Sequence, residues 1–272
     1  MVNGYAAASL AEALSLRAAH AVVPYSGGTD LMVENRTGVT YLFLNKVPEL
    51  KRIVVDADYV RIGAGVTFTQ ALSDNRVPQL MKDAVALIAA PAIRNAGTFG
   101  GNLGNGSAKA DTVLIEFVAD AKLCLKSLRG ERIVPVEEFY QGRKKLDLRD
   151  DELITEILLP KTGLEQYYYQ KVGGRSALAI SRVSFAGVFA MKDGKITNIA
   201  AAFGAVADTV VRYRDLEALL LGRTLAEASA LKEQYLKAYA DRMVLTRGRV
   251  SSEYRKAVCM NLLGEFLSRF GI

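Results

Sequence analysis

The thirteen residues 95–107 hold five glycines, three asparagines, one threonine and one serine. Such a segment can approach a ligand closely, because glycine adopts backbone angles closed to other residues. Phe99 and Leu103 lie inside it, which indicates packing against the protein, although a long surface loop is the alternative interpretation. The segment has neither the Gly-x-Gly-x-x-Gly pattern of a Rossmann fold nor a Walker loop ending in Gly-Lys-Ser/Thr. We therefore expect a phosphate-binding loop of another architecture.

A second glycine segment, Tyr25-Ser26-Gly27-Gly28-Thr29-Asp30, comes earlier in the chain. Successive amides around paired glycines form a concave nest that suits a phosphate oxygen. Ser26 and Thr29 can add hydroxyl donors, and Asp111, just beyond the first segment, can accept hydrogen bonds from ribose or ribityl hydroxyls. A tight turn between a strand and a helix is the alternative interpretation of this short motif.

A third segment, residues 167–175, reads Tyr-Tyr-Tyr-Gln-Lys-Val-Gly-Gly-Arg. Lys171 beside a bound cofactor would stabilise negative charge that develops on it. The alternative is a strand of ordinary tyrosines, with Lys171 and Arg175 in solvent.

The charge and the histidine and cysteine content limit the partners and the kinds of active site that this chain can have. The formal net charge is +6, but the charges are mixed along the chain without a dense basic run, so we expect no nucleic-acid partner. One histidine, His20, and two distant cysteines are too few for the usual zinc and iron–sulfur sites. With His20 as the single candidate base, the sequence also argues against a Ser-His-Asp site. Cys124 and Cys259 lie in apolar runs and are expected to be buried thiols. Redox or group-transfer chemistry would then belong to an organic cofactor.

The pattern of apolar residues predicts a mixed α+β protein. No run approaches the roughly 20 apolar residues of a membrane span, and the N-terminus is interpreted as an amphipathic helix, not a signal peptide, so we expect a cytoplasmic protein. Asp193-Gly194 is expected to close a hairpin. Helices are predicted at about 9–19, 67–72, 79–89, 112–119, 213–221, 224–236 and 251–270; strands at 40–44, 51–55, 59–62, 122–127, 132–135, 152–159, 167–172, 182–191 and 196–203.

In order and spacing these segments resemble the FAD-binding, or medium, subunits of molybdenum hydroxylases, and most of all the bacterial xanthine dehydrogenase type. The resemblance covers nearly the whole chain. The matching motifs are GGTDL, RNAGTFGGNLGNGSAKAD, DELITEILLP, the Lys171–Arg175 element and SSEYRKAV.

The resemblance implies a vanillyl-alcohol-oxidase/PCMH-type FAD-binding fold in residues 1–160, with subdomains of about 1–56 and 57–160, followed by a small α+β C-terminal domain in 161–272. FAD would be held non-covalently, because no residue matches a flavin-linking histidine. The first glycine loop and residues 98–102 would bind the pyrophosphate, Asp111 the sugar part, Ile88 and Ile154 the adenine or flavin side, and Lys171 would lie near the isoalloxazine ring. The expected cofactor-binding residues are Tyr25, Ser26, Gly27, Gly28, Thr29, Asp30, Leu31, Ile88, Gly97, Thr98, Gly101, Asn102, Ser107, Asp111, Ile154 and Lys171.

Two positions depart from the family pattern. Many relatives have Ser-Pro where this chain has Ser107-Ala108, which affects local loop shape. Many have an aspartate at the position of Ala179, which leaves the electron acceptor open.

The implied function is electron transfer in a heterotrimer. Molybdopterin would lie on a large partner subunit and two-iron two-sulfur clusters on a small one, and FAD would pass electrons to NAD or another acceptor. Purine, nicotinate and aldehyde substrates stay open, with xanthine or a related purine favoured by overall likeness. The alternatives are a free-standing FAD-dependent reductase of the same fold and a nucleotide-binding module without redox chemistry.

Overall fold

The computed structural model describes residues 3–34 and 37–272, which form two compact units. The first unit comprises residues 1–77, 88–107 and 120–161, apart from the four residues not described, and the second comprises 78–87, 108–119 and 162–272. Two short segments from inside 1–160 therefore group with the C-terminal residues. The domain boundary near residue 160 stays a prediction. Among the described residues, no helix is long and apolar enough to cross a membrane.

The N-terminal part of the first unit is a small parallel sheet in the order β1-β3-β2. Its strands are β1 (Asn3–Ala6), β2 (Val23–Tyr25) and β3 (Thr40–Phe43), and β1 pairs with β3 over four residues. Helix α1 (Leu10–Ala19) packs beside it and begins where the Ser9 hydroxyl accepts a hydrogen bond from the Glu12 amide, as expected for an N-cap. Strand β1 was not expected, because no strand was predicted ahead of the helix at about 9–19. The short helix α2 (Leu31–Glu34) follows β2.

A five-stranded sheet in the order β4-β5-β10-β6-β7 forms the rest of the first unit's framework. Each neighbouring pair is antiparallel. The central strand is almost wholly buried, which explains its near-continuous apolar sequence. The strands are β4 (Ile53–Val55), β5 (Tyr59–Gly63), β6 (Lys122–Ser127), β7 (Gly130–Pro135) and β10 (Leu153–Pro160). Short elements connect them: η1 (Pro48–Lys51), α3 (Phe68–Ser73), α5 (Pro91–Ala96), α6 (Phe99–Gly104), α8 (Val136–Phe139), β8 (Tyr140–Gly142) and β9 (Lys145–Leu146).

The second unit is built on an antiparallel sheet in the order β11-β12-β13-β14. Its strands are β11 (Tyr167–Val172), β12 (Val183–Lys192), β13 (Lys195–Gly204) and β14 (Val211–Arg212). The expected hairpin at Asp193-Gly194 is confirmed: both residues have positive φ, 52° and 73°, as a type I′ turn requires.

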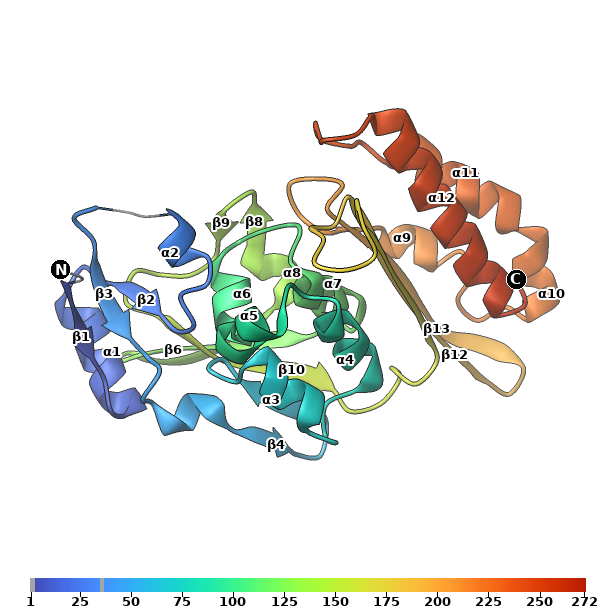
Figure 1. Ribbon diagram of the computed structural model, residues 1–272. Helices are drawn as coiled ribbons and strands as arrows, with labels where there is room; N and C mark the ends of the chain where they lie inside the picture. The colour runs from blue at the N-terminus through green and yellow to red at the C-terminus, as the bar shows by residue number, and fades with distance from the viewer. Residues whose placement is uncertain (1–2, 35–36) are drawn as a thin grey trace. The chain divides into compact units, whose positions relative to one another are not determined.

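Helices cover this sheet on both sides. Helices α4 and α7 lie on one side, and α11 and α12 pack together on the other (Figure 1). The bounds are α4 (Gln79–Ala86), α7 (Asp111–Val118), α9 (Arg214–Glu217), α10 (Leu225–Ala230), α11 (Lys232–Arg242) and α12 (Ser252–Arg269). The single helix expected over 224–236 is two helices, because α10 ends at Ala230 and α11 begins at Lys232.

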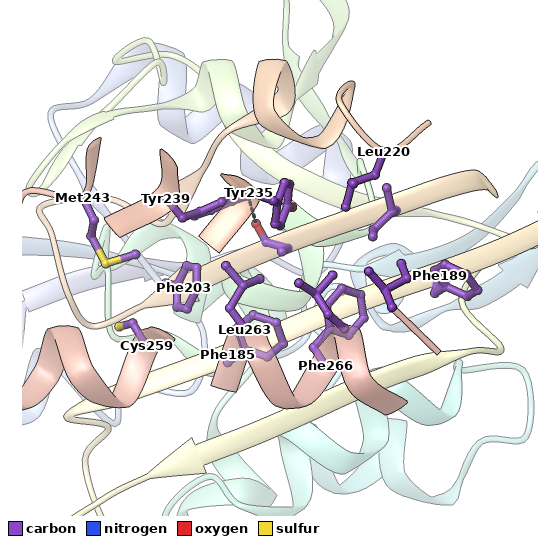
Figure 2. Close-up of a cluster of buried hydrophobic side chains, with 14 of the residues drawn as sticks. Phe185, Phe189, Phe203, Leu220, Tyr235, Tyr239, Met243, Cys259, Leu263 and Phe266 are labelled. Carbon is purple, nitrogen blue, oxygen red and sulfur yellow. Dashed lines mark hydrogen bonds between the residues drawn. The ribbon is translucent and has the colours of Figure 1, made fainter. Parts of the chain in front are cut away.

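An aromatic core joins the sheet of the second unit to α11 and α12 (Figure 2). The rings of Phe185 and Phe203 meet edge to face at 5.1 Å, and Tyr239 donates its hydroxyl to the carbonyl of Ala201 over 3.3 Å. Such pairs add to the burial of apolar surface that stabilises a core. Cys259 lies in this core and Cys124 in the first unit, and the burial of both thiols confirms the expectation.

Candidate cofactor-binding site

Both glycine segments of the first unit line one cavity of about 320 Å³. That volume lies at the lower end of the usual range for small-molecule sites, about 300–1,000 Å³. The expected site residues in its lining are Ser26, Gly27, Gly28, Thr29, Asp30, Leu31, Gly97, Thr98, Gly101, Asn102 and Ile154. Segments about 70 residues apart in the sequence thus share one concave surface.

Close packing holds the two segments together. A Cβ atom on Gly27 would lie only 1.9 Å from the carbonyl oxygen of Ala96, so no larger residue fits without a backbone shift. The Thr98 hydroxyl donates to the hydroxyl of Ser26 over 3.1 Å. Gly28 has φ 69°, the left-handed conformation that glycine adopts without strain.

Most of the long glycine segment is helical, because residues 95–96 end α5 and residues 99–104 form α6. Thr98 caps α6 by accepting a hydrogen bond from the Gly101 amide over 3.1 Å. Phe99 and Leu103, four residues apart on one helical face, are fully buried, which fixes the helix against the sheet. Gly100 allows this contact, because its Cβ would lie 2.6 Å from that of Ala64.

The two segments differ in which backbone donors are available to a ligand. The amides of Phe99, Gly100 and Gly101 donate to Val66 O, Ala64 O and Thr98 Oγ1. By contrast, within residues 3–34 and 37–272 the amides of residues 26–30 have no protein acceptor. The free nest donors therefore belong to the first glycine loop, while the second segment shapes the wall and contributes side chains.

One side of the cavity carries a line of polar side chains from three elements. The Asn105 amide donates to Asp30 Oδ2 over 2.7 Å, and Lys144 donates to Asn105 Oδ1. The Lys144 ammonium also lies 3.8 Å from Glu34 Oε1. Sequence reasoning missed Glu34, Asn105 and Lys144, and for Lys144 no local pattern distinguishes it from its basic neighbours.

Another part of the wall is apolar. Ile154, 8 % exposed, comes from β10 next to a change of register in its pairing with β6. Gly104 of α6 faces this side chain, since a Cβ on Gly104 would lie 4.0 Å from Ile154 Cδ1. The other aliphatic lining residues are Val23, Leu44, Leu50, Leu148 and Leu153.

Three expected residues of the first unit do not line this cavity. The Tyr25 ring packs on Tyr41 and Phe43, and its hydroxyl would lie 2.0 Å from a Cβ on Gly28. Tyr25 thus packs against Gly28 of the first glycine loop and does not line the cavity. Ile88, whose carbonyl accepts from Arg94, and Ser107 are also outside the lining. Their assignments as cofactor-binding residues stay predictions.

Asp111 and Lys171 form a buried ion pair in the second unit. Lys171 Nζ lies 2.7 Å from Asp111 Oδ2, and each side chain is 7 % exposed. Ser181 donates to Asp111 Oδ1 over 2.8 Å, and Lys171 also donates to Leu87 O over 2.9 Å. Burial raises the pKa of Asp111, while Lys171 and Ser181 oppose that rise. Lys171 is therefore not a solvated surface charge, and both Asp111 oxygens have protein partners.

Comparison with known proteins shows the family to which the chain is similar. The family described as "FAD binding domain in molybdopterin dehydrogenase" matches residues 1–162, and "CO dehydrogenase flavoprotein C-terminal domain" matches 167–270. The chain is 30 % identical over 276 residues to the xanthine dehydrogenase FAD-binding subunit of Escherichia coli O157:H7, covering 96 % of this chain and 93 % of that protein. It is 30 % identical to the nicotinate dehydrogenase FAD-subunit of Eubacterium barkeri, with 81 % and 80 % covered.

The fold has a close counterpart among solved structures. A carbon monoxide dehydrogenase chain from Hydrogenophaga pseudoflava superposes with a TM-score of 0.89, at 24 % identity, over 98 % of this chain and 96 % of that one. The cavity also fits FAD chemically. Free amides and hydroxyls suit a diphosphate, carboxylates suit sugar hydroxyls, and the aliphatic wall suits a planar ring. From the match over residues 1–162 and the near full-length identity to such subunits, this chain belongs to the FAD-binding flavoprotein subunits of the molybdopterin dehydrogenases, a family of oxidoreductases.

Proposed function

We propose that this chain is the electron-transfer subunit of a molybdenum hydroxylase of the xanthine dehydrogenase type, with FAD in the cavity of the first unit. The observation that carries the proposal is the convergence of both glycine segments on one cavity. The free amides of residues 26–30 would bind the diphosphate, and Ile154 would pack on a ring of the cofactor. FAD, when bound, supplies one-electron and two-electron redox chemistry.

The proposed partners would carry the metal cofactors for which this chain has too few ligands. It has one histidine and two cysteines, and both cysteines are buried with the pKa of each thiol raised by burial, Cys124 to about 11 and Cys259 to about 12. An iron–sulfur cluster needs several accessible thiolates, so the clusters would lie on a small partner subunit and molybdopterin on a large one. The heterotrimer would be cytoplasmic and would oxidise xanthine or a related purine, with NAD as the proposed electron acceptor.

Lys171 is proposed to act near the isoalloxazine ring. Its bonds to Asp111 and Leu87 O hold the ammonium group in one position. A fixed positive charge stabilises negative charge that develops beside it, and a preorganised group does this at little reorganisation cost. Because Asp111 accepts from both Lys171 and Ser181, we propose that holding Lys171 is its first role, and that any sugar contact uses its remaining lone pairs.

Flavin uptake and partner capture test the proposal in two stages. The purified chain should be yellow, or take up FAD after reconstitution, with FAD bound in preference to ATP and NAD. An affinity-tagged chain expressed in its native cell should copurify with a molybdopterin subunit and an iron–sulfur subunit. FAD uptake without these partners would favour the free-standing reductase, and preference for another nucleotide would contradict the FAD proposal.

The electron acceptor needs its own measurement. If NAD is the acceptor, NADH added anaerobically to the FAD-loaded chain should bleach the flavin absorbance, because electron transfer between the two is reversible. The Lys171→Met variant should bleach more slowly or reach a less reduced equilibrium at the same NADH concentration. A flavin that dithionite reduces but NADH does not would rule out NAD and leave another acceptor.

A further inference from the structure

We propose that Lys144 is a cofactor-binding residue that pairs with the anionic diphosphate of FAD. The inference rests on the proposed FAD site and adds to it a charged ligand contact on β8–β9, outside both glycine segments. Lys144 lies in the turn between these strands and lines the cavity.

The cavity wall carries more acidic than basic side chains, which disfavours a diphosphate unless a cation lies nearby. Among the described residues that line the cavity, Asp30 and Glu34 are acidic and Lys144 alone is basic. A diphosphate carries about two negative charges at neutral pH, and like charges at short range repel each other. The backbone amides of residues 26–30 supply dipoles but no net charge. Lys144 is therefore placed to offset the two carboxylates when an anion enters.

The β8–β9 turn is fixed against the end of the long glycine segment. The Lys144 amide donates to Gly106 O over 3.2 Å. Gly106 has φ 60°, and its Cβ would lie 3.1 Å from the Lys144 Cα, so a glycine is needed where the turn docks. Lys144 itself has φ 58°, a conformation that lysine rarely adopts. This strained conformation is retained where the turn brings Lys144 to the cavity.

The ammonium group keeps donors for a ligand. Its contacts here are Asn105 Oδ1 and, at 3.8 Å, Glu34 Oε1. An ammonium has three N–H donors, and the Lys144 side chain is 52 % exposed, so it can turn to a bound anion without losing a buried partner. Asn105 in turn donates to Asp30, which links Lys144 to the first glycine loop.

The test compares charge removal at Lys144 with charge removal at its neighbour in the same turn. Asn tolerates positive φ, so Lys144→Asn removes the charge but keeps the turn. Arg143→Asn removes an equal charge from an exposed residue that does not line the cavity. FAD is titrated into each cofactor-free chain at 50 and 500 mM NaCl, and melting temperatures verify folding.

We expect Lys144→Asn to raise the Kd for FAD about five- to tenfold at 50 mM NaCl, as for a half-exposed charge contact. The Kd of this variant should also depend less on salt than that of the wild type, because the screened contact is gone. Arg143→Asn should stay within twofold of the wild type, and Lys144→Arg should bind more tightly than Lys144→Asn.

Two results would overturn the inference. One is an Lys144→Asn Kd within twofold of the wild type, and the other is weaker binding with an unchanged salt dependence, which would indicate a structural effect. If the wild-type chain binds no FAD at all, the proposed function itself fails, and this outcome is distinct from failure of the Lys144 contact alone.

Discussion

The hydroxyl of Thr98 donates to the hydroxyl of Ser26 over 3.1 Å and so joins two segments separated by 72 residues. The same oxygen accepts the Gly101 amide at the start of α6. With Thr98 only 5 % exposed, one side chain both starts the helix and ties it to the first glycine loop. This hydroxyl therefore adds to the close packing of Gly27 on Ala96 in holding the two segments together.

Thr98→Val removes this hydroxyl but keeps the shape of the side chain. We expect a loss of about 1–2 kcal/mol in the free energy of unfolding, since an N-cap and a hydrogen bond are lost together. FAD affinity should fall as well, because the Ser26 side is no longer held. Urea denaturation and FAD titration measure the two effects. Thr98→Ser retains the hydroxyl and should recover most of the stability and most of the FAD affinity. A Thr98→Val chain with the stability and FAD affinity of the wild type would contradict this role of the hydroxyl.

Glu116 should make the stability of the second unit depend on pH. It is fully buried in α7, and burial raises the pKa of its carboxyl to about 8. In the unfolded chain this carboxyl has its ordinary pKa of 4.5. Protonation of Glu116 therefore stabilises the folded chain fully below pH 4.5, and this stabilisation is lost as the pH rises toward 8. Glu116→Gln has no carboxyl to ionise, so at pH 7 its free energy of unfolding should exceed that of the wild type by about 3 kcal/mol. This difference should become smaller toward pH 5. Urea unfolding from pH 5 to 8 measures the difference, and a constant difference would contradict burial of the carboxyl.

The Asp111–Lys171 pair should behave as one unit in a double-mutant cycle. Lys171→Met leaves a buried carboxylate without its cation, and Asp111→Asn leaves a buried ammonium, so each should cost about 3–5 kcal/mol. The double variant should lose clearly less than the sum. For Lys171→Met the loss should grow with pH, because the unpaired carboxyl, whose pKa burial already raises, must release its proton. Additive losses in chemical denaturation would show that the two charges do not interact.

Local patterns predicted much of this fold, because the relevant contacts are close in sequence. The 167–172 strand matches β11 residue for residue, and the turn chemistry of Asp193-Gly194 defined its hairpin. The helices expected at about 9–19 and 67–72 are also present as α1 and α3, whose caps Ser9 and Thr67 each accept a hydrogen bond from an amide three residues later.

Non-local contacts account for what was missed. Strand β1 is short and exposed and has no apolar alternation, so only its pairing with β3 makes it a strand. Helix α6 was expected to be a loop because glycine disfavours helices, but the burial of Phe99 and Leu103 outweighs that preference. Within the site, the pairing of Asp111 with Lys171 spans 60 residues. Lys144 gives no sequence signal, since its role depends on where the β8–β9 turn docks.

Equilibrium titration of FAD into the cofactor-free chain tests most directly whether both glycine segments hold one cofactor. The wild type should bind one FAD per chain. Gly27→Ala forces a Cβ against Ala96 O, so it should weaken that binding at least tenfold, since the segments must move apart. Gly264→Ala, in open space on α12, makes the same chemical change and should leave the affinity unaltered. A wild-type chain that takes up no FAD, or a folded Gly27→Ala chain that binds FAD as tightly as the wild type, would contradict the shared site.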